Sequence, residues 1–243
     1  MVFRKLIFAF LFVGSISLSP VKAQLELDLW FDGWVSLEDG TALQGQLSYY
    51  SDYTTGVLQI KVGERTYSFD ANQIVNFRFY DGQLKADRFF YSLPYSPPGN
   101  PNTIMLFFEA LYEGQHLSVL SKTEIRTQTR TANTSPYAYR GTYVPSWYNR
   151  NRNNSYTIDM PFETLYVVTP DTEIEEYSEP TALDKPNVRF KRANTDLLEK
   201  IMHDRNVKIQ AFLKENKFDL RRRADMLRTV VYYNELKSGI AAQ

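Results

Sequence analysis

The residues from Trp34 to Tyr91 constrain the fold more than any other part of the sequence, because short strand-like runs alternate there with turn signals. Val, Ile, Thr, Tyr and Phe are frequent in the runs, which are interrupted at Asp39-Gly40 and Gly63-Glu64. Asp-Gly and Gly-polar pairs tolerate the positive φ of tight hairpin turns. The stretch therefore predicts two successive β-hairpins in a curled antiparallel sheet, continued by an alternating strand from Ile74 to Tyr80.

This order of elements resembles the small SH3-like and Sm-like barrels: strand, Asp-Gly turn, strand, two central strands, one helical turn at Asp70 to Gln73, and a last strand. The resemblance covers about a quarter of the chain. It implies that the first β unit is a small barrel. Sm-like barrels bind RNA, but the stretch contains no matching RNA-pocket motif, so RNA binding is not carried over to this chain.

The N-terminal residues have the layout of a Sec signal peptide. Arg4 and Lys5 precede an apolar run from Leu6 to Val13, and Val21 and Ala23 occupy the positions that a signal peptidase reads. The run is too short to cross about 30 Å of hydrocarbon, and no cysteine follows it, which excludes a lipoprotein. We expect cleavage after Ala23, export to the periplasm or cell surface, and no integral membrane segment.

The leader, the strand-Asp-Gly-strand opening and a Tyr-Tyr-Asn-Glu-Leu stretch from Tyr232 to Leu236 in a basic helical tail form a wider pattern. This pattern resembles uncharacterised exported proteins of Bacteroidota-type bacteria. The resemblance implies export. It supplies no activity, cofactor or site residue.

Composition divides the chain into a leader and three regions. The leader, 1–23, is followed by a first β unit, 24–95, a second β unit, 96–182, and a basic helical tail, 183–243. The β units meet at a connector with three prolines between Pro97 and Pro101, because proline interrupts strands and helices. The predicted fold class is therefore α+β: mostly antiparallel β in two hairpin-rich units, followed by a C-terminal three-helix segment.

In the tail, the apolar period changes from two to about 3.6, which is typical of helices. Asp196 and Glu199 have capping-box spacing for a first helix that ends near His203. A second helix is predicted from Val207 to Lys217, and Asp219 is expected to cap a third. The apolar face predicted for the third helix consists of Leu220, Ala224, Leu227 and Val231.

The segment 125–156 differs from the rest of the chain in composition. Five arginines and no acidic residue lie between Glu124 and Asp159, among many Tyr, Asn and Ser residues. Arginine forks can hold carboxylates or phosphates, and Tyr and Trp faces stack on sugar rings and anchor protein interfaces. The segment is a candidate contact surface; a flexible insertion in a hairpin is the alternative. The candidate binding residues are Tyr137, Tyr139, Arg140, Tyr143, Trp147, Tyr148, Arg150 and Arg152.

Charge is divided unevenly along the chain. A chain that begins at Gln24 has 25 basic and 28 acidic residues, but residues 183–243 have a net charge of +6 and residues 24–182 one of −9. The tail is therefore suited to anionic lipid, lipopolysaccharide or another acidic partner. The alternative is that the tail and the β body attract each other within one molecule. The predicted basic patch consists of Arg221, Arg222 and Arg223.

The sequence lacks the usual catalytic sets. It has no cysteine, which excludes disulfides, thiolate catalysis and Cys-ligated zinc. His116 and His203 are its only histidines, and phosphate-cradling, dinucleotide-binding and nucleophile-elbow motifs are absent. Glu109 lies inside an apolar strand and is either a catalytic acid or a residue that lies at an edge or is paired with a partner; we favour the edge or paired residue. We predict no catalytic residue, metal site or cofactor.

Acidic residues could still support two activities. A pair of carboxylates can hydrolyse a glycosidic bond without leaving a sequence motif. An acidic cluster could bind calcium, but its spacing matches no EF-hand loop, and we favour a solvated strand face. The cluster consists of Asp171, Glu173, Glu175, Glu176 and Glu179.

Taken together, these features predict an exported, non-catalytic envelope protein that acts as an interaction or accessory module. Its expected partner is an envelope protein or a membrane surface. Glycan or peptidoglycan binding through the aromatics of segment 125–156 is the alternative, and a carboxylate-based glycoside hydrolase is a third hypothesis. Interleaved Asp and Glu in the tail, together with export, argue against a nucleic-acid partner.

Overall fold

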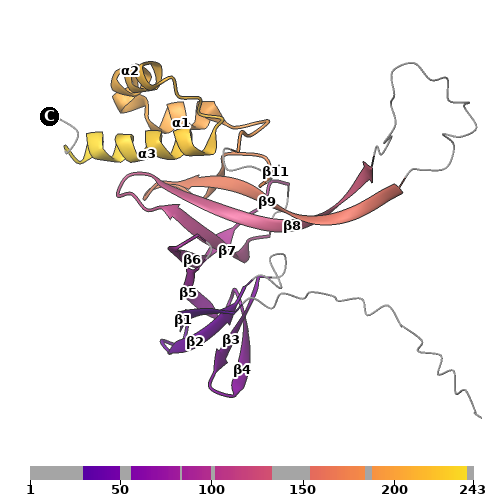
Figure 1. The fold of residues 1–243 in the computed structure, drawn as a ribbon. Coiled ribbons are helices and arrows are strands. Elements are labelled where there is room, and N and C mark those ends of the chain that lie inside the picture. Colours follow the sequence, from indigo (N-terminus) through magenta and orange to yellow (C-terminus); the bar gives the residue numbers. More distant parts are fainter. Residues whose placement is uncertain are drawn as a thin grey trace, which may run out of the picture.

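The protein is built on one large antiparallel sheet. The structure, a computed structural model, describes residues 30–49, 56–82, 84–99, 102–132, 154–183 and 188–239. The sheet has eleven strands in the order β10-β9-β8-β7-β6-β5-β1-β2-β3-β4, with β11 also paired to β9. Figure 1 shows the helices gathered over one end of the sheet, beside β8 and β9. The predicted α+β class, with mostly antiparallel strands and three helices near the C-terminus, is confirmed.

The strands are β1 (Phe31–Leu37), β2 (Ala42–Ser48), β3 (Val57–Val62), β4 (Arg65–Asp70), β5 (Ile74–Asp81), β6 (Ala86–Tyr95), β7 (Ile104–Tyr112), β8 (Ser118–Ala132), β9 (Asn154–Val168), β10 (Glu175–Glu176) and β11 (Thr181–Ala182). The helices are α1 (Thr195–Ile201), a 3-10 turn (His203–Arg205), α2 (Asn206–Asn216) and α3 (Arg223–Lys237).

Both predicted hairpins are present, as β1–β2 and β3–β4. Gly33 and Gly45 face each other in the β1–β2 register. A Cβ atom on Gly33 would collide with the carbonyl oxygen of Arg78, and one on Gly45 with that of Lys61. These two glycines therefore allow neighbouring strands to approach closely where the sheet curls. Because β5 pairs with β1 and β6 and not with β4, the sheet is not closed, and the predicted small barrel is not confirmed.

The proline-rich connector joins two neighbouring strands of the same sheet. Pro94 lies within β6, opposite Met105 of β7. The turn between these strands contains Pro97 and Pro98. The two predicted β units therefore share one sheet, which the sequence had left open. Their boundaries as separate domains remain a prediction.

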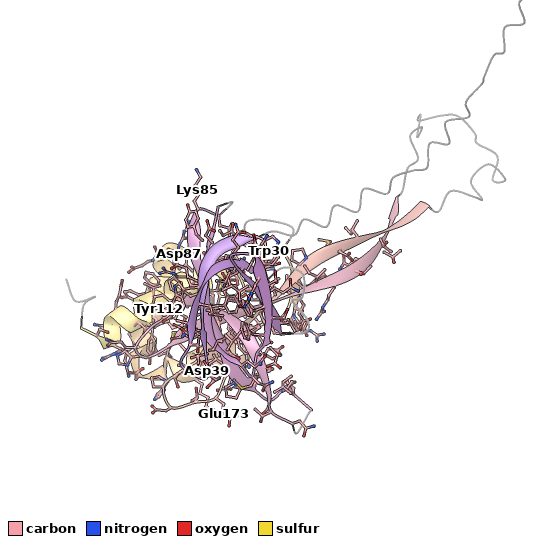
Figure 2. All side chains as sticks on the ribbon, turned by 90° about the horizontal axis from the view of Figure 1, so that it is seen from below. Trp30, Asp39, Lys85, Asp87, Tyr112 and Glu173 are labelled. Carbon is pink, nitrogen blue, oxygen red and sulfur yellow. The ribbon has the colours of Figure 1, made fainter. Side chains whose placement is uncertain are left out.

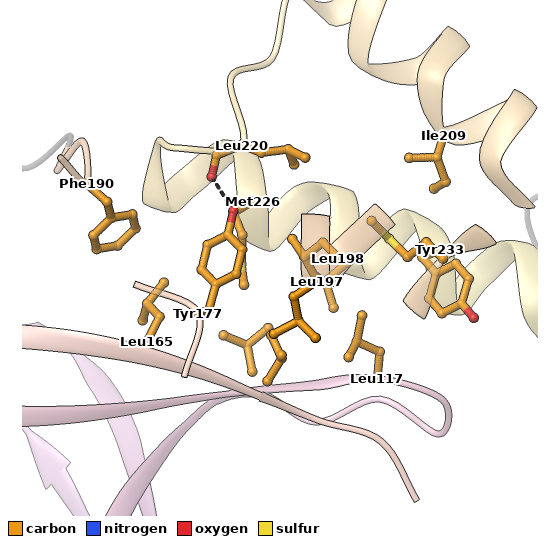
Figure 3. Close-up of a cluster of buried hydrophobic side chains, with 14 of the residues drawn as sticks. Leu117, Leu165, Tyr177, Phe190, Leu197, Leu198, Ile209, Leu220, Met226 and Tyr233 are labelled. Atoms are coloured by element: carbon orange, nitrogen blue, oxygen red, sulfur yellow. Dashed lines mark hydrogen bonds between the residues drawn. The ribbon is translucent and has the colours of Figure 1, made fainter. Parts of the chain in front are cut away.

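The helices cover an apolar face formed by β8 and β9. Leu117 before β8 and Leu165 of β9 are fully buried there, and Met226 and Val230 of α3 lie against the same core. Tyr177, which follows β10, is joined to the segment before α3, because its hydroxyl donates a 2.8 Å hydrogen bond to the carbonyl oxygen of Leu220 (Figure 3). Burial of this core supplies the tertiary support that such short helices need.

Three details of the predicted helices are wrong. The cap of α1 is Asn194, whose side chain accepts from the Leu197 amide at 3.2 Å, and not Asp196. The third helix begins at Arg223, because residues 221–223 first run alongside residues 188–190. The buried face of α3 also differs from the predicted one: Leu220 is buried but precedes the helix, and Leu227 is only partly buried. The buried residues of α3 are Asp225, Met226, Thr229, Val230, Tyr233, Asn234 and Leu236.

Candidate functional site

The eight predicted binding residues lie outside the described residues, but both of their flanks are described. Tyr137, Tyr139, Arg140, Tyr143, Trp147, Tyr148, Arg150 and Arg152 all fall between β8 and β9. These two strands pair without interruption from Ser118↔Val168 to Ala132↔Asn154. Segment 133–153 therefore connects Ala132 to Asn154, two residues that pair with each other at the end of one hairpin.

The outer part of that hairpin extends beyond the rest of the sheet. The register of β7 with β8 reaches Ser121, and β11 pairs with β9 at Phe162 and Glu163. Beyond these positions, no third strand among the described residues flanks residues 125–132 or 154–161, which we term the distal ribbon. Figures 1 and 2 show the distal ribbon projecting from the body of the molecule.

Polar side chains pair both along and across the strands at the root of the distal ribbon. Glu124 accepts hydrogen bonds from Lys122 at 2.5 Å and from Arg126 at 3.0 Å. Partial burial raises the pKa of the Glu124 carboxyl, but these two cations outweigh it and hold the pKa below its usual value. Across the strands, Thr127 donates to Asp159 at 2.6 Å. These contacts stiffen the ribbon where it leaves the sheet.

The three arginines of the predicted basic patch have different environments. Arg223 binds Glu163 of β9 through two hydrogen bonds of 2.8 and 3.1 Å, and the Glu163 side chain is only 3% exposed. Arg221 lies 3.5 Å from Asp219. The Arg222 side chain has no ion pair with any residue that the structure describes. Arg223 thus holds the tail on the sheet, whereas Arg222 remains available to a partner.

Arg222 lines a hollow of about 500 Å³ together with two arginines that the sequence reasoning missed. Arg189 is held by Asp219, whose Oδ2 accepts from its Nε and lies 2.9 Å from its Nη2. Arg228 is 65% exposed and approaches Asp225 only to 4.0 Å. We term this site the arginine hollow. Its lining residues are Val188, Arg189, Arg222, Ala224, Asp225 and Arg228.

Asp219 keeps its charge beside the arginine hollow. Partial burial raises the pKa of its carboxyl, but hydrogen bonds from the Arg221 amide and the Arg189 guanidinium outweigh this effect and hold the pKa below its usual value. Asp219 is therefore ionised at neutral pH and fixes the position of Arg189. No local sequence signal pointed to Arg189, because its neighbours come from a pairing across more than thirty residues of chain.

The two histidines line one hollow although they lie far apart in sequence. His116 and His203 share a space of about 370 Å³ with Lys200 and Lys237. The Nδ1 atom of His203 is 2.9 Å from the carbonyl oxygen of Lys200. Across the described ranges, no group of three or more His, Asp or Glu side chains is placed to hold a metal ion.

Glu109 is a paired carboxylate, as favoured from the sequence. Its two oxygens accept from Nε and Nη2 of Arg88 at 2.7 and 2.6 Å. The Glu109 side chain is 15% exposed and that of Arg88 11%. A bidentate partner satisfies the charge of a carboxylate that the apolar strand β7 would otherwise leave unpaired.

No protein family, curated protein or solved structure matches the chain. Among the helices that the structure describes, none combines the length and the apolar character needed to cross a membrane. Any assignment of function therefore depends on the surfaces described above.

Proposed function

We propose that this chain is a non-catalytic interaction module of the cell envelope, exported by its Sec leader, as in the Bacteroidota-type proteins it resembles. It presents the distal ribbon and a basic helical surface to an envelope protein or a membrane surface. The proposal rests on one observation: the distal ribbon extends past its neighbouring strands, and the Arg- and Tyr-rich segment joins its two strands.

The geometry of the distal ribbon supports contact with a partner. A two-stranded ribbon is marginally stable alone, whereas a third strand or a packed surface stabilises it. Along residues 125–132 and 154–159, its outer edges present backbone N–H and C=O groups that an added strand could pair with, whereas the Pro161 carbonyl already accepts from the Leu183 amide. Ile125 adds an apolar side chain that is 38% exposed. A partner would therefore find backbone, apolar and cationic groups close together.

The test is partner capture in intact cells of the source organism by crosslinking and affinity purification of the tagged protein. We expect replacement of Trp147, Tyr148 and Arg150 by alanine to reduce recovery of a stoichiometric envelope protein by at least about tenfold, because aromatic and arginine anchors dominate interfaces. The melting temperature should stay unchanged. A matched control replaces Tyr67 and Tyr80, which are 39% and 50% exposed elsewhere on the sheet. Undiminished recovery with the triple variant would reject the assignment.

Glycan binding is a second candidate, supported by a described row of side chains. Trp34, Arg78 and Phe89 are direct neighbours across β1, β5 and β6. The Arg78 guanidinium lies 5.8 Å from the Trp34 ring centroid and 5.4 Å from that of Phe89. Aromatic faces beside a hydrogen-bond donor suit a sugar ring.

Cosedimentation with purified sacculi tests glycan binding. The sacculi should pellet the protein, and Trp34→Ala should weaken pelleting more than Tyr80→Ala. Absence of pelleting at every salt concentration would reject peptidoglycan as the ligand.

A further inference from the structure

We propose that the arginine hollow is a binding site for a phosphate ester, in which Arg222 and Arg228 contact the phosphate and Arg189 forms the fixed wall. The site lies on the helical layer and is independent of the distal ribbon. Its failure would leave the proposed ribbon contact unaffected, and loss of the ribbon contact would leave the phosphate site intact.

Charge around the arginine hollow is incompletely balanced. Among the described residues, Arg189, Arg221, Arg222 and Arg228 face only two carboxylates, those of Asp219 and Asp225. This leaves a local charge of +2, since Arg223 is already neutralised by Glu163. A phosphate monoester has a charge of about −1.5 to −2 at neutral pH. The ligand that compensates this surface most fully is therefore a phosphate monoester.

The backbone around the arginine hollow is held in place. Arg189 and Arg222 form a β-bridge, and the Arg223 amide donates to the carbonyl oxygen of Val188 at 3.0 Å. The side chains of Arg189 and Arg222 therefore extend from paired backbone and not from separate loops. A pre-organised arrangement of guanidinium groups loses less conformational entropy when it binds an anion.

Two backbone amides add to this cationic surface. No side chain caps the start of α3, and the amides of Ala224 and Asp225 have no acceptor among the described residues. Both residues line the arginine hollow. The amides add to the arginine charge, because the first turn of a helix attracts anions.

The shape of the arginine hollow favours an ester over inorganic phosphate. Its volume of about 500 Å³ exceeds the needs of one phosphate group, and Val188 and Ala224 supply apolar lining. Asp225 opposes an anion, but its Oδ2 accepts from the Asp219 amide at 3.1 Å, and its side chain is only 12% exposed. The phosphate would then lie toward Arg222 and Arg228, with the organic part of the ester over the apolar lining.

Titration calorimetry with glycerol 3-phosphate, at constant ionic strength, tests the site on the purified chain. Cosedimentation with phosphatidylcholine vesicles, with and without phosphatidic acid, tests the same chemistry on a membrane. We expect Arg222→Gln and Arg228→Gln each to weaken binding by about tenfold, the effect of losing one charge-assisted hydrogen bond. Arg222 is exposed, and Arg228 is 65% exposed with its guanidinium 5.7 Å from the Phe218 ring centroid, so the melting temperature should change little in either variant.

Two further variants separate a specific site from general attraction. Asp225→Asn should strengthen binding, because it removes the opposing charge. Arg65→Gln, on the exposed strand β4, should leave binding unchanged. Binding of glycerol 3-phosphate supports a soluble ester as the source, and binding only to phosphatidic acid vesicles supports a lipid headgroup. Binding to neither, or equal weakening by Arg65→Gln and Arg222→Gln, would overturn the proposal.

Discussion

Asn234 of α3 and Leu117 before β8 exchange hydrogen bonds as residues of two paired strands do. The Leu117 amide donates to Asn234 Oδ1 at 3.2 Å, and Asn234 Nδ2 donates to the Leu117 carbonyl oxygen at 2.9 Å. The His116 amide donates to the same Oδ1 at 2.9 Å. Asn234 is only 5% exposed. The Tyr-Tyr-Asn-Glu-Leu stretch thus provides a second polar link between α3 and the sheet, in addition to the Arg223–Glu163 pair.

Replacing Asn234 by alanine should destabilise the protein by about 3 kcal/mol, because it leaves two amides and a carbonyl without partners in a buried position. Urea unfolding followed by circular dichroism measures the change. Glu235→Ala, at the exposed neighbouring position, should stay within about 0.5 kcal/mol of the parent. Equal effects of the two substitutions would contradict the role of Asn234.

Gly114 leaves the space that Asn234 occupies, since a Cβ atom there would collide with the Asn234 side-chain amide. Gly114→Ala should therefore destabilise by about 1–3 kcal/mol. Gly82→Ala is the matched control, because its Cβ would meet no atom within 4 Å. In the Gly114→Ala/Asn234→Ala double variant the effects should be less than additive. Simple additivity would show that the two residues act independently.

The Arg223–Glu163 pair should behave as a buried ion pair. Arg223→Met leaves the Glu163 charge without its partner and should cost about 3–5 kcal/mol. The Arg223→Met/Glu163→Met double variant should recover most of that loss, since well-packed apolar residues replace buried pairs at little cost. Arg192→Ala removes a pair whose arginine is 81% exposed, and it should cost under about 1 kcal/mol. A double variant no more stable than Arg223→Met would reject this account.

The Asp204–Lys237 contact predicts a specific pH dependence. Partial burial raises the pKa of Asp204, but hydrogen bonds from Lys237 and Tyr233 outweigh it and lower the pKa. The hydrogen bond to Asp204 raises the pKa of Lys237. The Asp204 contribution is therefore complete above the unfolded carboxyl pKa of about 3.9 and is lost as pH falls through the folded value. The Lys237 contribution is complete below the unfolded amine pKa of about 10.4 and is lost as pH rises through the folded value.

Melting curves across this pH range test the contact. Asp204→Asn should lower the melting temperature at neutral pH. It should also make the fall in melting temperature toward acid and toward alkaline pH less steep than in the parent. Glu199→Gln, on the exposed side of α1, should leave the shape of the curve unchanged. If the melting temperature of Asp204→Asn falls at acid pH as steeply as that of the parent, the contact does not contribute to stability.

Local turn chemistry made much of the β topology predictable. Asp39-Gly40 and Gly63 located two hairpins, and an alternating run located β5. Sheet closure could not be read in the same way, because it depends on whether β5 meets β4 or β6, and both pairings suit the same apolar alternation. The resemblance to small barrels rested on element order alone, and element order does not specify which edges meet.

The helical layer shows where local rules fail. Asp219 has the residue type of a cap, but Arg222 is held in extended backbone by Arg189, so α3 cannot begin until Arg223. The face of α3 contains the polar residues Thr229 and Asn234, whose burial is possible only because their partners are present. The sequence did not indicate Arg189 and Arg228, because the contacts that bring them together are not local in sequence. The arginine hollow is made by a pairing that is not local in sequence.

The position of the helical layer in the chain has a consequence for folding kinetics. Leu117 and Asn234 are 117 residues apart, so their contact is among the long-range ones that slow folding. During synthesis, the apolar face formed by β8 and β9 precedes every helix that covers it. Until α3 docks, this face is exposed to association with other chains. Variants at Gly114 and Asn234 should therefore lower the yield of folded protein through slower closure and aggregation, beyond their effect on equilibrium stability.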